Sequence, residues 1–213
     1  MVYRIYVEKQ TEFAHEAAAL LADIRNVLGI SSVSSLRMFN RYDVEGVEET
    51  VFAACRNTVF SEPQIDLTFD QLPEEEANWF AVEYLPGQFD QRADAAGQCI
   101  ALLSQREAPL VRTARVYAIY GAVGAAELDA IKRYVINPVE SREASLDPFD
   151  TLELRASSPA PIPVLTGFRE MDEDALQQMI RQHSLAMDLD DIMCCRAHFC
   201  SERRDPTLTE LKL

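Results

Sequence analysis

Residues 83–99 read E-Y-L-P-G-Q-F-D-Q-R-A-D-A-A-G-Q-C, and the folding of this stretch sets the organisation of the chain. The apolar run Trp79–Tyr84 leads into it and predicts a strand. Pro86-Gly87 predicts a tight turn, and the alanine-rich sequence after it predicts a helix. A strand, a turn and a helix within so short a span indicate either a binding site or a joint between structural units.

The same order of elements is predicted twice along the chain. In each half, a strand rich in β-branched and aromatic residues precedes a helix with apolar residues every three or four positions, and a second strand and helix follow. The predicted elements of the first half span residues 2–7, 13–28, 33–42 and 48–60, with a short edge strand at 65–69, and those of the second half span 79–85, 89–105, 111–120 and 125–136. Because the offset between the halves stays at about 76–78 residues, we interpret them as an internal duplication.

The duplication predicts an α+β fold for residues 1–155, built from two β-α-β-α repeats at about 1–75 and 76–155. Each repeat would form a sheet with one face covered by its helices. A single unit of that size is marginally stable. We therefore expect the two to pack on each other as a pseudo-twofold pair.

The remaining sequence predicts a Pro-rich connection followed by a mostly helical domain. Residues 156–163 read A-S-S-P-A-P-I-P, which favours an extended, semi-rigid chain. We place the whole connection at 156–170 and the helical domain at 171–213.

Helix starts are well marked in this domain. Asp172 and Asp188 are expected to cap helices that run through His183 and Phe199. The segment Thr207–Glu210 reads T-L-T-E, a capping box that marks the start of a further helix. Because so little sequence follows this box, we expect the domain to be truncated and the chain to be a fragment of a longer protein.

The composition argues against several classes of partner. The chain has 20 basic and 35 acidic residues, a formal net charge of −15, and nucleic acids and anionic membranes both require basic patches. No signal peptide and no membrane-spanning apolar run is present. Five cysteines without a framework pattern indicate reduced thiols, so we expect a cytoplasmic protein.

Cys194, Cys195, His198 and Cys200 place four soft metal ligands close together. Residues 194 and 198 would share a helix face, which zinc can use, but Cys200 would lie on another face. We therefore favour ordinary packing of small apolar cysteines over a metal site. His15, which lies between two glutamates, is predicted to face solvent.

Asp90 and Asp94 lie one helical turn apart in the predicted helix, with Arg92 between them. Paired carboxylates can act as general acid and base, but close to a helix N-terminus we favour an interaction with the helix dipole. Cys99 shares an apolar stripe with Ile100 and is predicted to be a buried structural thiol.

The motifs G-x-x-x-x-G-K-S/T, G-x-G-x-x-G and G-x-S-x-G do not occur in the sequence, and its seven glycines are scattered. No group of residues combines a nucleophile, a base and an oxyanion site. Residue chemistry alone therefore predicts no catalytic, cofactor-binding or metal-binding residue and no complete enzyme.

Three segments resemble phosphoribosylformylglycinamidine synthase (FGAM synthase), the large single-chain amidotransferase of purine biosynthesis. They are residues 40–46 together with 56–63, residues 85–94, and residues 134–145, which read N-R-Y-D-V-E-G with R-N-T-V-F-S-E-P, L-P-G-Q-F-D-Q-R-A-D, and Y-V-I-N-P-V-E-S-R-E-A-S. The tail R-D-P-T-L-T-E, residues 204–210, is similar to the end of that family's linker domain. The resemblance extends over essentially the whole chain.

The resemblance implies a layout that agrees with the duplication. In the family, an N-terminal domain that resembles a fused pair of small PurS-type subunits precedes a mostly helical linker domain, a synthetase core and a glutaminase domain. The parent enzyme converts formylglycinamide ribonucleotide, glutamine and ATP to formylglycinamidine ribonucleotide. The resemblance implies that the ATP, magnesium and catalytic sites lie outside residues 1–213, so it assigns no such residue to this chain.

The resemblance also implies that this chain docks onto the synthetase and glutaminase domains of its parent and shields ammonia transfer, without activity of its own. We expect Pro86, Gly87, Asp90 and Arg92 to form an interdomain contact, because the first half has no equivalent of this stretch. Apolar surface that would face the synthetase core predicts weak self-association. The alternative is a free-standing α+β ligand-binding or regulatory module with its ligand between the two halves.

Overall fold

The computed structural model describes residues 1–153 and 161–213. The chain divides into two compact units, Met1–Leu154 and Arg155–Leu213. Residues 156–160 of the predicted Pro-rich connection lie outside the described residues. The end of that connection belongs to the second unit, where the backbone N–H of Leu165 donates to the carbonyl of Pro206 at 2.8 Å.

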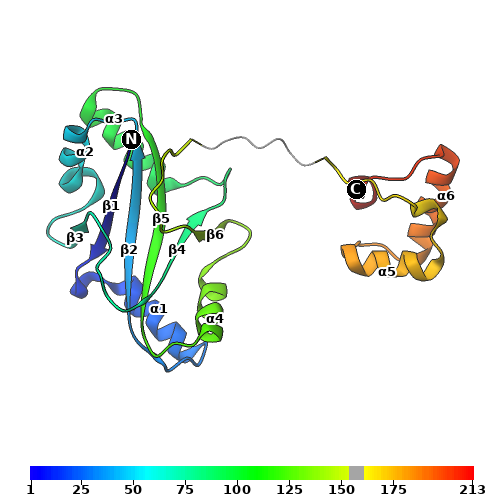
Figure 1. The fold of residues 1–213 in the computed structure, drawn as a ribbon, viewed down its shortest axis with the longest axis horizontal. Coiled ribbons are helices and arrows are strands. Elements are labelled where there is room, and N and C mark those ends of the chain that lie inside the picture. Colours follow the sequence, from blue (N-terminus) through cyan, green and yellow to red (C-terminus); the bar gives the residue numbers. More distant parts are fainter. Residues whose placement is uncertain (154–160) are drawn as a thin grey trace. The chain divides into compact units, whose positions relative to one another are not determined.

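A single antiparallel sheet of six strands forms the first unit (Figure 1). The strands are β1 (Val2–Lys9), β2 (Val33–Glu45), β3 (Asp66–Phe69), β4 (Asn78–Tyr84), β5 (Leu110–Gly121) and β6 (Ser141–Ala144). Their order is β3-β1-β2-β5-β4-β6. The strands of the first half, β3, β1 and β2, run from one edge to the centre, and their counterparts β6, β4 and β5 run from the other edge to the centre in the same order. The predicted α+β class is confirmed. The two halves, however, do not pack as separate sheets, because β2 and β5 pair along their length and join them edge to edge.

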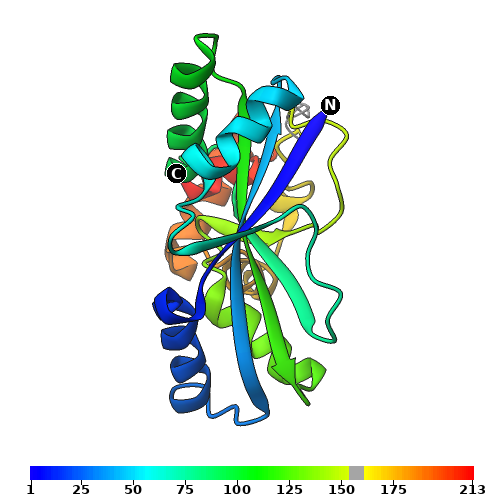
Figure 2. The same cartoon turned by 90° about the vertical axis from the view of Figure 1, so that its left-hand side faces the viewer.

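Helices cover one face of this sheet. The helices α1 (His15–Asn26) and α4 (Ala125–Val135) lie near one end of the long strands, and α2 (Glu49–Cys55) and α3 (Gln91–Ser104) lie near the other (Figure 1). Figure 2 shows α1, in blue, and α3, in green, on the same side of the strands. The helix predicted over 48–60 widens at its end into a π-helical turn, Arg56–Phe60.

Two apolar cores lie between the helices and the sheet, one at each end of the long strands. The first core gathers residues of β1, β2, α2 and α3, including Ile5 and Ile100. The second gathers residues of α1, β2, β4, β5 and α4, including Ile24 and Phe80. Each core takes side chains from both halves of the sequence, so neither half holds a complete core of its own.

The second unit is a small helical domain. The helices α5 (Glu173–His183), α6 (Leu189–Glu202) and α7 (Leu208–Lys212) pack with a 3-10 turn, Phe168–Glu170, around a shared apolar core. The predicted caps are confirmed: the carboxylates of Asp172 and Asp188 each accept a hydrogen bond of 2.9 Å from a backbone N–H three residues later. The capping box that begins at Thr207 is also present and starts α7.

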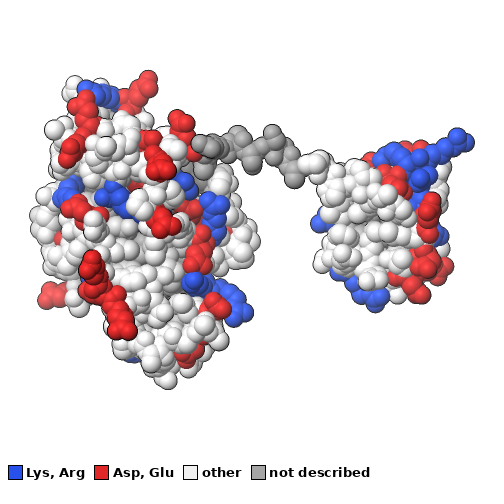
Figure 3. All heavy atoms as spheres, viewed as in Figure 1, with Lys and Arg blue, Asp and Glu red and all other residues white. Residues whose placement is uncertain are grey.

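Charged side chains of both signs are interspersed over the face of the first unit that Figure 3 shows. Within residues 1–153 and 161–213, no helix combines the length and the apolar character that crossing a membrane requires.

Candidate functional site

The middle of the sheet carries polar residues on the face that the helices cover. Along β2 and β5 the side chains of this face are apolar toward both ends, but Asn40, Thr113 and Arg115 interrupt them at the centre. The strand register places Asn40 opposite Arg115, and Tyr42 opposite Thr113. Polar side chains on a helix-covered sheet face indicate a place where the cover is open.

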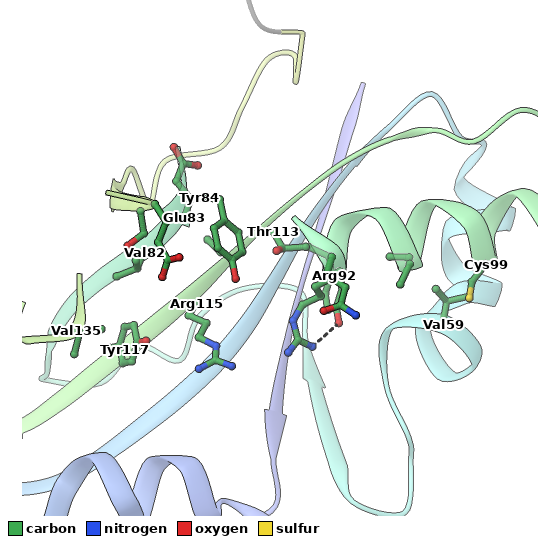
Figure 4. A pocket seen from close by; sticks show the side chains of 17 residues that line it. Val59, Val82, Glu83, Tyr84, Arg92, Cys99, Thr113, Arg115, Tyr117 and Val135 are labelled. Atoms are coloured by element: carbon green, nitrogen blue, oxygen red, sulfur yellow. Dashed lines mark hydrogen bonds between the residues drawn. The ribbon is translucent and has the colours of Figure 1, made fainter. Parts of the chain in front are cut away.

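The cover is open because the two helix pairs pack over opposite ends of the sheet. Two cavities, of about 690 and 590 Å³, lie over its centre. Both are lined by Tyr42, Val59, Arg92 and Arg115, so they are two parts of one groove that crosses the sheet. We call this feature the central groove. Figure 4 shows the part next to β4, where Arg92 and Arg115 come from different elements.

Arg92 reaches the groove from the first turn of α3. Its guanidinium donates to the hydroxyl of Tyr42 at 3.3 Å, the bond drawn in Figure 4. Among the described residues it has no carboxylate partner within ion-pair distance.

Asp90 fixes the start of α3 and therefore the position of Arg92. One carboxylate oxygen accepts a hydrogen bond from the backbone N–H of Ala93 at 2.9 Å, and the other accepts one from the Thr113 hydroxyl at 2.7 Å. Asp94 is engaged separately, since it accepts a bond from the side-chain amide of Gln98 at 2.7 Å. The two carboxylates form no acid–base pair, and the predicted helix-end role of Asp90 agrees with this geometry.

Arg115 rises from β5 into the same groove. Its guanidinium lies 3.2 Å from the carboxylate of Glu16, in the first turn of α1, and both side chains are well exposed, at 43% and 71%. Such a pair is weak because solvent screens it. Next to it, burial raises the pKa of the Tyr117 hydroxyl above its usual range.

The Pro86-Gly87 turn lies on the surface beside the groove. Gln88 donates its backbone N–H to the carbonyl of Leu85 at 3.0 Å, and Gly87 has φ +92°, so the turn is of type II with proline and glycine at their preferred positions. Of the four residues predicted to form an interdomain contact, Arg92 lines the groove, Asp90 supports it, and Pro86 and Gly87 form this exposed turn. Tyr84 and Phe89, which flank the turn, are 47% and 71% exposed.

The opposite face of the sheet holds a charged cluster that the sequence analysis missed. Arg41 and Asp43 are fully buried in β2, and their charged atoms approach to 2.9 Å. The guanidinium groups of Arg4, Arg41 and Arg112 lie 5.0–5.4 Å from the ring centre of Phe149. The sequence signal for this cluster is the alternation in β2, where Arg41 and Asp43 lie on the opposite face from Tyr42 and Val44.

The segment after β6 covers this cluster. Arg41 donates to the carbonyl of Ser145 at 2.7 Å, and Arg4 donates to that of Leu146 at 2.8 Å. Farther along, the Glu45 carboxylate accepts a bond of 2.6 Å from the N–H of Leu152, which holds the pKa of that carboxyl below its usual range. The end of the first unit is thus fixed to its own sheet.

The predicted burial of Cys99 is wrong. The buried line of α3 runs through Ala96, Gly97 and Ile100, and Cys99 faces outward at the wall of the central groove. Ala96 and Gly97 lie on the buried side of the helix, where Gly97 is close to Pro109 and Val111, and Cys99 lies on another side. The buried thiol is Cys55, and burial raises its pKa, which disfavours the reactive thiolate.

The remaining candidates are the cysteine and histidine side chains at 194–200 and His15. Within the described part of the chain, no group of three or more His, Cys, Asp or Glu side chains is arranged to hold a metal ion. Cys200 makes a long contact of 3.7 Å with the carbonyl of Arg169. His15 is exposed, as predicted, although it borders the groove.

Comparison with models of known protein families gave no match, and comparison with curated proteins gave no significant similarity.

Proposed function

We propose that this chain is the N-terminal portion of an FGAM synthase, a PurS-like domain followed by a linker domain. Its role would be structural: docking of the synthetase and glutaminase domains and shielding of ammonia transfer, without activity alone. The observation that carries the proposal is the sheet order β3-β1-β2-β5-β4-β6, in which two β-α-β-α-β halves join through their long strands. Two fused small subunits of one kind would produce this arrangement.

The positions of the motif residues support the same proposal. Arg41, from the first FGAM-like segment, bonds to Ser145, from the third, across more than a hundred residues of sequence. In the tail segment, Arg204 donates to both carboxylate oxygens of Glu210, at 3.0 and 2.7 Å. Asp205 accepts a bond from the backbone N–H of Gly167 at 2.9 Å. These motif residues hold the fold together, as a structural segment of a larger enzyme requires.

The exposed turn offers a docking surface for the rest of the parent. Tyr84 and Phe89 present aromatic area on either side of Pro86-Gly87, and aromatic side chains contribute strongly when a partner buries them. The synthetase and glutaminase domains would be the partners, and ATP and magnesium would bind to the parent's synthetase core. A cytoplasmic location follows from that role.

The proposal can be tested by assembly in trans. The 213-residue chain would be mixed with a separately produced FGAM synthase remainder that contains only the synthetase and glutaminase domains. We expect a 1:1 complex in sedimentation and glutamine-dependent turnover that neither part shows alone. Turnover by the 213-residue chain alone, or failure of the parts to associate, would overturn the proposal.

A pair of variants tests the docking surface itself. Tyr84→Ser combined with Phe89→Ser should weaken association by about tenfold or more, because two aromatic contacts are removed. The matched control is Val27→Ser, at the residue that follows α1, where the side chain is 65% exposed. Equal weakening by both variants would count against docking through the turn.

The central groove favours a second candidate, a free-standing ligand-binding module. Its cavities lie between the two halves and have the size of ordinary small-molecule sites. Association with the FGAM synthase remainder separates the two candidates, since a free-standing module has no reason to bind it.

A further inference from the structure

We propose that the central groove is a binding site for a small organic monocarboxylate with an apolar body, held by Arg92 and Arg115. The inference rests on the geometry of the groove and holds whether or not the chain belongs to FGAM synthase. Two guanidinium groups from different elements, α3 and β5, line both of its cavities.

The ion pairs around the groove leave Arg92 available for an anion. The chain carries −15 overall, yet at the groove centre two arginines meet a single close carboxylate, that of Glu16. The other carboxylates nearby are occupied or peripheral. Glu83 is bound by Arg112 and Arg142 on the far side of β4, Asp66 is bound by Lys9 at 2.8 Å, and Glu62 and Glu140 are exposed. Among the described residues, Arg92 is the cation of the groove without an ion-pair partner, so a single carboxylate could pair with it.

The hydrogen-bonding groups suit a carboxylate. A guanidinium presents its donors as a planar fork that matches the two oxygens of a carboxylate. The Arg92 guanidinium already donates to the Tyr42 hydroxyl, so its direction is set before a ligand arrives. The Asp90 cap fixes the helix turn that carries it, and this preorganisation lowers the entropic cost of binding.

Part of the wall of the larger cavity suits an apolar body. Val59, Val82 and Val135 line it together with the ring of Tyr84 (Figure 4). Its volume of about 690 Å³ falls within the range of small-molecule sites. A ligand with a short chain and one ring would bury its apolar part against Val82, Val135 and Tyr84, on one side of the arginines, while its carboxylate met Arg92 and Arg115.

The probe for the test is 4-phenylbutyrate, titrated into the full chain and followed by two-dimensional amide NMR. We expect saturable shifts at residues of the groove, centred on Arg92, Thr113 and Arg115. The neutral amide 4-phenylbutanamide has the same shape without the charge and should bind about tenfold more weakly. Phenyl phosphate, a dianion, should not bind more tightly than the carboxylate.

Variants establish which residues hold the ligand. Arg92→Gln and Arg115→Gln should each weaken binding of 4-phenylbutyrate by about tenfold, and Arg92→Lys should recover part of the loss because it keeps the charge but not the fork. The control is Arg106→Gln, whose side chain is 66% exposed, pairs with Glu48 and lies outside the groove. Trp79 fluorescence would confirm that each variant is folded.

Several results would overturn the inference. These are no binding at millimolar concentration, equal binding of the amide and the carboxylate, tighter binding of phenyl phosphate, or shifts outside the groove. A chain that assembles with the FGAM synthase remainder but binds no carboxylate would refute this inference alone and leave the proposed function standing.

Discussion

Arg41 and Asp43 show how a single pair of residues ties distant parts of the chain together. Both are inaccessible to solvent, and Asp43 also pairs with Arg4, while Arg41 reaches the carbonyl of Ser145. A buried ion loses its hydration and is tolerated only when its partners compensate it. Burial lowers the pKa of the Arg41 guanidinium, and the neighbouring carboxylate opposes that effect. Asp43 is therefore the anion that pairs with one buried cation, Arg41, and one partly buried cation, Arg4.

We predict that Asp43→Asn destabilises the first unit by about 3 kcal/mol, since the change keeps the shape and leaves Arg4 and Arg41 without their anion. Urea unfolding followed by Trp79 fluorescence measures this, because the chain's single tryptophan lies in this unit. The matched control is Asp70→Asn, which removes the partner of Arg56 at a position that is 74% exposed. That change should cost less than about 1 kcal/mol. Similar losses in both variants would mean that burial does not set the cost.

At the scale of elements, the start of α3 is fixed by its cap. Asp90 bonds the helix at Ala93 and the sheet at Thr113, so one carboxylate joins two elements. This double role explains why the Pro-Gly turn is followed at once by a helix that lies against β5.

We predict that Asp90→Ala lowers the stability of the first unit by about 2 kcal/mol, because it removes both the cap and the bond to Thr113. Asp90→Asn should cost less, since its amide oxygen can still accept the bond from Ala93. Thr113→Val removes the bond to the sheet alone and should fall between the wild type and Asp90→Ala. Urea unfolding ranks the three variants, and a loss in Asp90→Asn equal to that in Asp90→Ala would contradict the capping role.

The stability of helix α7 should depend on pH through the carboxyl group of Glu210. Bonds from Arg204 and from Thr207 lower the pKa of Glu210 from 4.5 to about 2. Because the folded pKa is the lower one, this carboxylate stabilises the fold above pH 4.5, and the contribution is lost as pH falls toward 2. We predict a Glu210 carboxyl titration near 2 by carbon-detected NMR, which Arg204→Gln should move upward. A midpoint near 4.5 in the unmodified chain would contradict the prediction.

Local sequence signals predicted the elements better than their assembly. Asp172 and Asp188 predict helix starts correctly because an N-terminal cap involves only four consecutive residues. The Pro86-Gly87 turn is equally local. Which side of α3 is buried depends on how the helix is placed on the sheet, which the local sequence does not determine, and so the position of Cys99 was predicted wrongly. The groove exists because α1 and α4 cover one end of the sheet and α2 and α3 the other, and this placement is not encoded in any local stretch of sequence. Its polar residues Asn40 and Arg115 lie far apart in the sequence, and only the strand register shows that they meet.

At the scale of the whole molecule, the sheet of the first unit consists of two matching halves that are joined at its centre. The long strands β2 and β5 form the central pair, and each helix-face core combines side chains from both halves. A half on its own would expose the full edge of its long strand and parts of two incomplete cores. The edge-to-edge junction is thus the feature on which the fold of residues 1–153 depends.

We therefore predict that residues 1–75 and 76–153, produced as separate polypeptides, lack a cooperative fold as monomers and form a 1:1 complex when mixed. Sedimentation and circular dichroism of each fragment and of the mixture measure this, and Trp79 fluorescence reports the association. Val116→Pro should prevent complex formation, because proline removes a backbone donor in the central strand β5. Val139→Ser, at an exposed loop position, should leave it unchanged. Cooperative melting of either fragment as a monomer would show that the junction is dispensable, because a half that folds alone needs neither the partner strand nor the shared cores.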